Sequence, residues 1–296
     1  MSSNQDSKSR LEKSGTSLPK LPLVPREMWE DVGLNKIPCP VCQDDRHVLL
    51  VRKEAVTGVE EGTSYSCHCL FLKNFWQTFM ANVSPRYQYI ARKKLAPSTK
   101  SRLPVDVQRQ VLKQLHEHPL GSYSFFGPAG TSKTTFAVAL YRCALLENTG
   151  KAFQAAGTIP MSTFVSSAKT PAVWRISAKQ LVDEFQSVVS GRPLVDYKGT
   201  PRADQSPLVT RQKILRAVAV GLTPRLFMEE VDKVSNTEFR VNCMFEVIDA
   251  IYEAMGQLVL VSNMTREEFK NHFGADIARR VKENEDARIF DFHTAQ

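Results

Sequence analysis

The chain has 296 residues, enough for one sizeable hydrophobic core and a smaller module. Lysine and arginine number 39 against 31 acidic residues, and the net charge of +8 favours nucleic acid or another polyanion as a partner. No apolar run approaches the roughly 20 residues that cross a bilayer, and residues 1–20 are rich in serine and lysine without the apolar stretch of a secretory signal. We therefore expect a cytoplasmic protein without membrane contact, beginning with a disordered arm over residues 1–20.

Four of the six cysteines fall in a short N-terminal span: Cys39, Cys42, Cys67 and Cys69. Without a secretory signal, clustered cysteines favour metal binding over disulfides. The first pair suits a tight knuckle around one ion, and an extended strand through the second pair would point both thiolates to the same side. The pattern predicts a structural Zn²⁺ site with four thiolate ligands, in a zinc-ribbon-like module over residues 21–97.

Two features leave the ligand set of this site open. His47 or His68 can replace one thiolate, and a thiol-rich hairpin without metal is the alternative. The other two cysteines, Cys143 and Cys243, lie in helical patterns among apolar residues and are predicted to be buried thiols.

Residues 70–95 combine a helical pattern with aromatic and basic side chains. Such a mixture can stack on bases and meet phosphates, or it can pack a small module while the basic groups stay solvated. Prolines and serines then predict a linker and domain boundary over residues 98–104. Apolar residues at helical spacing predict an amphipathic helix over residues 105–117.

A glycine-rich segment follows a short apolar run and precedes a helical pattern, which predicts a strand, a loop and a helix. The segment comprises Gly127, Pro128, Ala129, Gly130, Thr131, Ser132, Lys133, Thr134 and Thr135. In a phosphate-binding loop of this kind, backbone N–H groups hold a triphosphate such as ATP, Lys133 reaches its outer oxygens and Thr134 places a hydroxyl on Mg²⁺. The positive end of the helix dipole adds to the attraction. An ordinary glycine-rich turn is the alternative.

Ser132 stands where a glycine usually precedes the lysine of such loops, and this favours nucleotide binding over fast hydrolysis. The helix after the loop is expected to run to about residue 147, followed by a polar insertion over residues 148–171. A strand over residues 173–177 then leads into a helix that Ser177 can cap. Residues 190–207 form a second irregular stretch, which is basic and can touch DNA.

An apolar strand beginning at residue 225 ends in the adjacent carboxylates Glu229 and Glu230. We assign Glu229 to the metal, through its water shell, and Glu230 to polarising the attacking water. A glutamate in the first position is one methylene longer than the commoner aspartate, a second reason to expect a slow ATPase. A strand that merely ends in a solvated acidic turn is the alternative.

The remaining segments alternate between helical and strand patterns. A long helix is expected over residues 236–255 and a buried strand over residues 257–263. Asn263 can orient the attacking water or can cap the next helix. A short helix over residues 275–281 carries Arg279 and Arg280, which are either solvated or reach the triphosphate of a neighbouring subunit. A last strand is expected over residues 287–292.

In order and spacing, these motifs resemble the AAA+ ATPases of the DnaC/DnaI helicase-loader and IstB transposition-helper group. The resemblance spans about residues 105 to 292 and is carried by residues 127–135, 176–184, 226–232, 261–264 and 277–281. It implies an α/β fold over residues 105–296, namely an AAA+ P-loop NTPase three-layer sandwich whose five-stranded parallel sheet has the phosphate-loop strand at its centre. A weaker similarity covers residues 83–87.

The same resemblance implies roles and partners. Asn263 matches the sensor asparagine of these proteins, and Arg280, with Arg279 adjacent, matches their trans-acting arginine. The family assembles as nucleotide-dependent homo-oligomeric rings or spirals on DNA. Loading of a replicative helicase in DNA replication is the leading hypothesis. The alternatives are target selection for a transposase, and a nucleotide-gated adaptor with little turnover.

Overall fold

The computed structural model describes residues 47–53, 60–66, 68–91, 95–156, 173–190, 210–284 and 287–293. These residues fall into two compact units: the first contains the described residues up to Thr78 and residues 149–156, and the second contains Phe79 to Asn148 and the described residues from Val173 onward. Within these ranges, no helix combines the length and the apolar character that a bilayer crossing requires.

The first unit contains an antiparallel hairpin of β1 (His47–Lys53) and β2 (Glu60–Ser66), with His47 opposite Ser66. The extended conformation predicted for Cys69 is wrong. The strand ends at Ser66, and Cys69 lies in the first turn of α2 (His68–Asn82), because the helical pattern of the following residues extends upstream to His68. Cys67 lies outside the described residues, so its position relative to Cys69 stays a prediction.

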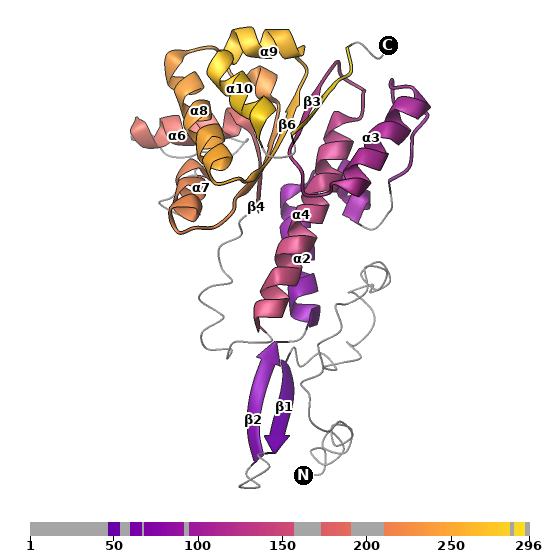
Figure 1. The fold of residues 1–296 in the computed structure, drawn as a ribbon, viewed down its shortest axis with the longest axis vertical. Helices are drawn as coiled ribbons and strands as arrows, with labels where there is room; N and C mark the ends of the chain where they lie inside the picture. Colours follow the sequence, from indigo (N-terminus) through magenta and orange to yellow (C-terminus); the bar gives the residue numbers. More distant parts are fainter. Residues whose placement is uncertain are drawn as a thin grey trace. The chain divides into compact units, whose positions relative to one another are not determined.

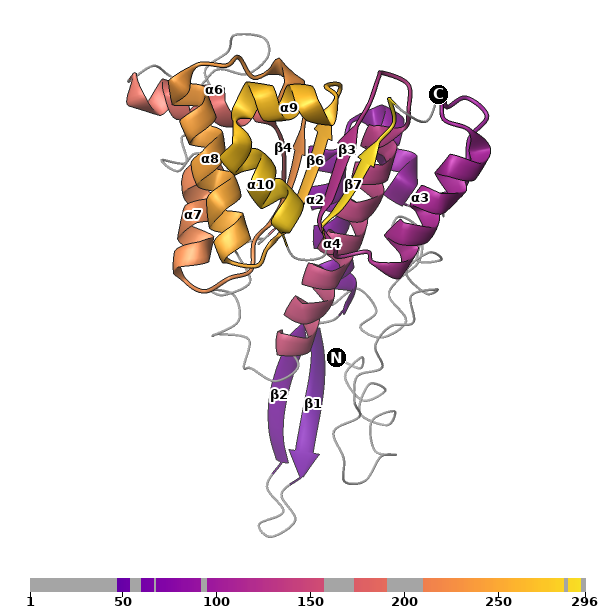
Figure 2. The same ribbon diagram turned by 45° about the horizontal axis from the view of Figure 1, so that its top comes forward.

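The second unit is built on a sheet of five parallel strands (Figure 2). Their order across the sheet is β4 (Val173–Ser177), β5 (Arg225–Glu229), β6 (Gln257–Ser262), β3 (Tyr123–Phe126) and β7 (Arg288–Asp291). The predicted five-stranded parallel sheet is therefore confirmed. The strand before the glycine-rich loop, expected at the centre, is instead fourth in the order, because only β7 pairs beyond it.

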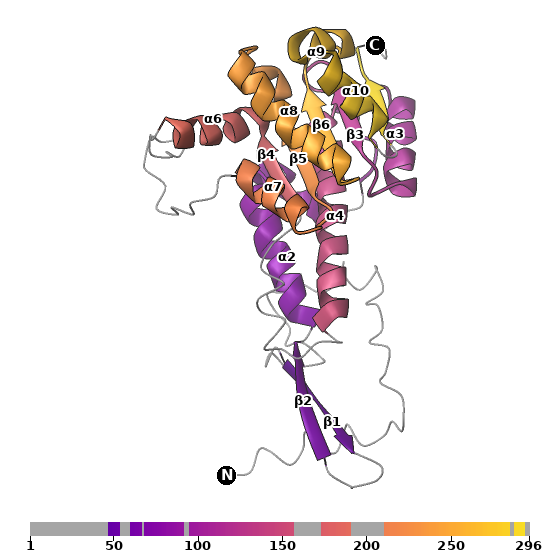
Figure 3. The same ribbon diagram turned by 60° about the vertical axis from the view of Figure 1, so that its left-hand side comes forward.

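Helices cover both faces of this sheet, which makes the second unit three-layered (Figures 1 and 3). On one side lie α3 (Val105–Glu117) and α4 (Lys133–Ala156). On the other side lie α6 (Ala178–Val189), α7 (Thr210–Ala219), α8 (Glu238–Glu253), α9 (Arg266–Phe273) and α10 (Ala275–Glu283). Successive residues of a strand point to opposite faces. Leu226 and Met228 of β5 accordingly join the core under α6 to α10, whereas Phe227 contacts Tyr141 of α4, with ring centroids 5.3 Å apart.

Most predicted elements form near their expected positions. Helix α3 has the predicted bounds, and the Ser177 hydroxyl accepts a hydrogen bond of 3.1 Å from Gln180 N at the start of α6, as expected for a cap. Three differences stand out. Helix α4 continues to Ala156, into the predicted polar insertion. Helix α7 was not predicted, since only Ile214 and Ala217 of its ten residues are buried and its apolar pattern is weak. Residues 98–104, expected to link two domains, belong to the second compact unit.

Short helical turns complete the unit at η1 (Pro85–Ala91) and η2 (Val231–Lys233). Of the two cysteines predicted to be buried, Cys243 lies in the core, where burial raises the pKa of its thiol to about 11, and Cys143 is only partly buried. Neither cysteine forms a disulfide within the described residues.

Candidate functional site

The glycine-rich segment joins β3 to α4 as the predicted loop. Strand β3 ends at Phe126 and α4 begins at Lys133. Gly127, Gly130 and Ser132 have positive φ angles of 145°, 88° and 63°. The first helical hydrogen bond runs from Phe136 N to Ser132 O, at 3.1 Å. The N–H groups before Phe136 therefore have no intrahelical acceptor, and they are donors that a bound anion can use.

Lys133 is folded into this loop and is only 6% exposed. Its Nζ donates to the carbonyl oxygens of Gly127 at 2.5 Å and Pro128 at 2.7 Å, and to the Thr131 hydroxyl at 3.3 Å. Burial lowers the pKa of Lys133 to about 8, while the nearby Asp232 carboxylate opposes the shift. Within the described part of the chain, Lys133 forms no ion pair, and its hydrogen bonds go to neutral oxygens.

The loop residues fit a phosphate group. Ala129 and Gly130 are exposed at the crest of the loop, and Thr134 is partly exposed in the first turn of α4. Gly127 cannot carry a side chain here, because a Cβ would lie 2.7 Å from Phe292 Cβ. The backbone can thus approach a ligand closely, with Lys133 as the cation beside it.

Glu229, predicted to hold the metal through water, ends β5 in an ion pair with Arg175 of the neighbouring strand β4. Arg175 Nη2 lies 2.5 Å from Glu229 Oε2, and both side chains are largely buried. A second nitrogen of Arg175 donates to the carbonyl oxygen of Asn82. The other carboxylate oxygen, Glu229 Oε1, is buried and accepts no hydrogen bond within the described residues. That oxygen suits a metal-bound water, so the site fits Mg²⁺ with one carboxylate oxygen free and one engaged.

Glu230, predicted to polarise water, is the half-exposed residue after β5. Its backbone is left-handed, with φ 56° and ψ 39°, and its carboxylate pairs with Lys233. The structure therefore places Glu229 and Glu230 next to each other but gives each its own basic partner.

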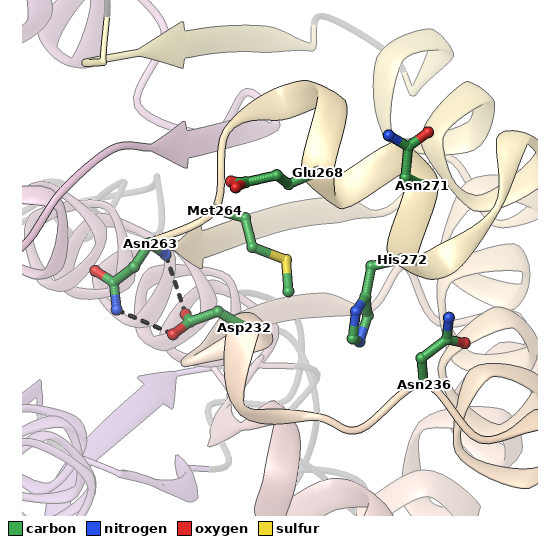
Figure 4. A pocket seen from close by; sticks show the side chains of 7 residues that line it. All are labelled: Asp232, Asn236, Asn263, Met264, Glu268, Asn271 and His272. Carbon is green, nitrogen blue, oxygen red and sulfur yellow. Dashed lines mark hydrogen bonds between the residues drawn. The ribbon is translucent and has the colours of Figure 1, made fainter.

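Asn263, which follows β6, is fixed by Asp232 and does not cap α9. Asp232 accepts hydrogen bonds of 3.0 Å from both the backbone N and the side-chain Nδ2 of Asn263 (Figure 4). Helix α9 is capped instead by Thr265, in a reciprocal capping box with Glu268. The capping alternative for Asn263 is thus wrong. Asp232 was not assigned a role from the sequence, and the signal available was its position two residues after the paired glutamates.

Asp232 and Asn263 line one side of a pocket of about 560 Å³ (Figure 4). The other lining residues are Asn236, Met264, Glu268, Asn271 and His272. His272 Nε2 lies 2.7 Å from the carbonyl oxygen of Val234, which fixes the ring. The Asp232 carboxylate of this pocket also acts on the pKa of Lys133 in the phosphate loop.

The two adjacent arginines of α10 differ sharply in their surroundings. The Arg280 side chain is 16% exposed, pairs with Asp249 and lies 4.6 Å above the ring of Phe245. The hydrogen bond to Asp249 raises the pKa of Arg280. Arg279 is 52% exposed, and its one ion pair among the described residues is with Glu283, one turn along the helix. Arg280 thus has partners in its own subunit, and Arg279 is the arginine that faces solvent.

The predicted zinc ligands Cys39, Cys42 and Cys67 lie outside the described residues, and Cys69 is in α2. Among the residues that the structure describes, no group of three or more His, Cys, Asp or Glu side chains could hold a metal ion. The zinc site therefore stays a prediction.

No protein-family model and no curated protein sequence matches this chain. The chain is similar to the solved structure of AMPPCP-bound DnaA from Aquifex aeolicus at 14% identity and a TM-score of 0.40, covering 70% of this chain and 50% of that one. It is also similar to the crystal structure of a DNA replication initiation factor at 11% identity and a TM-score of 0.38, covering 67% and 51%. The chain spans about half the length of each.

Proposed function

We propose that this protein is a DNA-binding AAA+ ATPase that binds Mg²⁺-ATP at the phosphate loop and loads a replicative helicase. The observation that carries the nucleotide site is Lys133, a buried lysine at the N-terminus of α4 that hydrogen-bonds only to neutral oxygens of its own loop. A phosphate would supply the missing negative charge, and the first-turn N–H groups would donate to it. The order of motifs and the net charge of +8 support the assignment to DNA-associated AAA+ proteins.

In this proposal each carboxylate has one task. Glu229 holds a water of the metal through Oε1, while Arg175 fixes the other oxygen. Mg²⁺, when bound, neutralises charge on the phosphates. Once the ion pair between Glu230 and Lys233 has opened, the Glu230 carboxylate accepts a proton from the attacking water. Asp232 keeps the Asn263 amide in place.

A nucleotide-gated adaptor with little turnover is the second candidate. One observation favours it: Glu229, predicted to hold the metal, and Glu230 and Arg280, predicted to be catalytic, each form an ion pair within the chain. Hydrolysis would require at least the Glu230 pair to open, whereas nucleotide binding would not.

ATP hydrolysis separates these two functions. We would measure the rate with no DNA, single-stranded DNA and double-stranded DNA, for the wild type, Glu230→Gln and the matched control Glu117→Gln, an exposed residue at the end of α3. An ATPase requires a DNA-stimulated rate that Glu230→Gln lowers by about 100-fold and that the control leaves unchanged. If the wild type and Glu230→Gln show the same background rate of ATP hydrolysis, and DNA does not change it, an ATPase function is excluded. Saturable ATP binding would then support the adaptor function.

We also propose that the N-terminal module holds a structural zinc ion and binds the partner protein. Metal analysis of purified protein tests it, comparing the wild type with Cys39→Ser combined with Cys69→Ser. We expect one zinc per chain in the wild type and in a Cys143→Ser control, and none in the double variant. Equal metal content in all three would exclude the site.

A further inference from the structure

The segment just before α3, residues 98–103, lies on the phosphate loop, and we refer to it as the strap. Arg102 N donates to the carbonyl oxygen of Gly130 at 3.0 Å. The Ser132 hydroxyl donates to the Ser101 hydroxyl at 2.9 Å, and Ser101 in turn donates to the Gly130 carbonyl oxygen at 3.5 Å. The strap and the loop are therefore joined at three points, although about 30 residues separate them in the chain.

The strap is held rigidly by one buried side chain. Gln108 of α3 is 2% exposed. Its Nε2 donates to the carbonyl oxygens of Ser98 at 3.0 Å and Leu103 at 2.8 Å, and its Oε1 accepts a hydrogen bond of 2.8 Å from Ser98 N. Both ends of the strap are thus fixed to the same helix, and the strap presents its middle residues to the loop in one geometry.

Arg102 is the residue that the strap presents. A Cβ built on Gly130 would lie 3.2 Å from Arg102 Cδ and 3.3 Å from Arg102 Nε, so the arginine side chain lies directly against the loop. Arg102 is exposed, and in the described part of the chain its guanidinium forms no ion pair or hydrogen bond. A cation without a partner therefore stands beside the crest of a loop that already contains Lys133.

Ser132 links this arrangement to the unusual loop sequence. Its φ of 63° lies in the left-handed region that disfavours a non-glycine residue. The hydroxyl compensates by bonding to Ser101, an interaction that glycine could not make. The serine therefore ties the loop to the segment that carries Arg102.

We propose that Arg102 binds the terminal phosphate of the nucleotide from within the same subunit, with Ser101 as the positioning residue that holds it there. This inference rests on the proposed nucleotide site. The backbone N–H groups of such a loop enclose the inner phosphates, so the terminal phosphate is the one open to a side chain from another segment. A guanidinium can meet two phosphate oxygens at once, in a geometry that a lysine cannot reproduce.

Nucleotide affinity tests the role of Arg102. The dissociation constants of Mg²⁺-ATPγS and Mg²⁺-ADP would be measured for the wild type, Arg102→Ala, Arg102→Lys and the control Arg109→Ala. Arg109 is an exposed arginine of α3 paired with Asp106. We expect Arg102→Ala to weaken ATPγS binding about tenfold or more and ADP binding less than twofold, Arg102→Lys to lie between, and Arg109→Ala to match the wild type. An equal loss for both nucleotides, or no loss beyond that of the control, would overturn the assignment.

A double-mutant cycle tests Ser101. If Ser101 acts by positioning Arg102, Ser101→Ala lowers ATPγS affinity in the wild type but has little further effect in Arg102→Ala. Additive losses would overturn the positioning role. Lys133→Ala separates this inference from the proposed function. If the wild type binds neither nucleotide, the nucleotide site itself fails. If the wild type binds both, Lys133→Ala binds neither and Arg102→Ala behaves as the wild type, only the role of Arg102 fails.

Discussion

Lys133 carries a charge that its own loop does not neutralise, and this has a consequence for pH. Burial lowers the pKa of Lys133 from 10.5 to about 8 in the free protein, and a bound phosphate would raise it again. We expect ATP affinity to be full below about pH 8 and to fall as the pH rises through that value. Binding at pH 8.5 should then take up a proton, whereas binding at pH 6.5 should involve no proton exchange by this group.

Calorimetry in buffers of different ionisation enthalpy measures that proton uptake. Lys133→Arg serves as the control, because arginine stays protonated at both pH values. Equal proton uptake by the wild type and Lys133→Arg at pH 8.5 would contradict the assignment of the proton to Lys133. The same shift affects the stability of the free protein with a defined sign: the unfolded chain binds more protons between about pH 8 and 10.5, so this group makes folding more favourable as the pH rises through that window.

The ion pair of Arg175 and Glu229 makes a prediction about stability. Because both side chains are largely buried, removing Arg175 leaves the Glu229 carboxylate without its partner. We expect Arg175→Met to lower the free energy of unfolding by about 3 kcal/mol, and Glu229→Gln added to Arg175→Met to recover part of that loss. Urea denaturation measures both. A loss no larger than that of Arg279→Ala, which removes an exposed pair, would mean that the buried pair contributes little.

The residues of the loop could be predicted from the sequence, but the ion pairs of the site residues could not. The glycines, lysine and threonine of the loop are local in sequence, so their spacing was enough to predict a strand, loop and helix. The partners of the site residues are not local. Arg175 pairs with Glu229 across 54 residues and Arg280 with Asp249 across 31, and no pattern in the chain indicates which charges meet. The match of Arg280, with Arg279 adjacent, to a trans-acting arginine came from the resemblance to AAA+ ATPases and took no account of such pairings.

The junction between β3, its loop and the end of β7 depends on Gly127. Gly127 has a φ of 145°, and a Cβ there would lie 2.7 Å from Phe292 Cβ, just after β7. We expect Gly127→Ala to lower the free energy of unfolding by about 3 kcal/mol and to weaken ATP binding, because the alanine must push β7 away or move the loop.

Gly221→Ala is the matched control for that variant. Gly221 also has a positive φ, of 77°, but no atom lies within 4 Å of a Cβ built on it. Its replacement should cost only the backbone strain, about 1 kcal/mol. Chemical denaturation of both variants measures the difference. Equal losses would show that contact with Phe292 does not constrain the loop.

Strands were easier to predict than helix ends. The three inner strands, β5, β6 and β3, are short and largely apolar runs, as expected for parallel strands buried on both faces, and all five strands form near their predicted positions. Helix α7 has only two buried residues and gave no clear pattern. The start of α2 was misread because two cysteines separated by one residue suggested a strand, and the helical pattern downstream outweighed that local signal. The order of the strands across the sheet does not follow from their order in the sequence, so the central position predicted for β3 was wrong.

In an assembly of several subunits, Arg279 and Arg280 are expected to have different roles. If ATP lies between subunits, a solvent-facing arginine of one subunit must reach the nucleotide of the next. Since Arg280 is paired within its own chain, we expect Arg279→Ala to abolish DNA-stimulated hydrolysis without changing thermal stability. Arg280→Ala should instead lower thermal stability, because it removes an ion pair and the contact with Phe245.

Mixing the variants tests whether Arg279 acts between subunits. Neither Arg279→Ala nor Lys133→Ala alone should hydrolyse ATP, but a mixture forms some interfaces with an intact lysine on one side and an intact arginine on the other. We expect part of the activity to return in the mixture, and none to return when Arg279→Ala and Lys133→Ala are combined in one chain. A mixture as inactive as its components would contradict action in trans.

Nucleotide binding at the loop is the claim on which the other inferences depend. Titration of the purified protein with a fluorescent adenine nucleotide in the presence of Mg²⁺ tests it most directly, alongside Lys133→Ala and the control Lys113→Ala, an exposed lysine of α3. We expect saturable binding of one nucleotide per chain in the wild type and the control, weakened at least tenfold in Lys133→Ala. Absence of saturable binding in the wild type, or equal affinity in all three proteins, would contradict the claim.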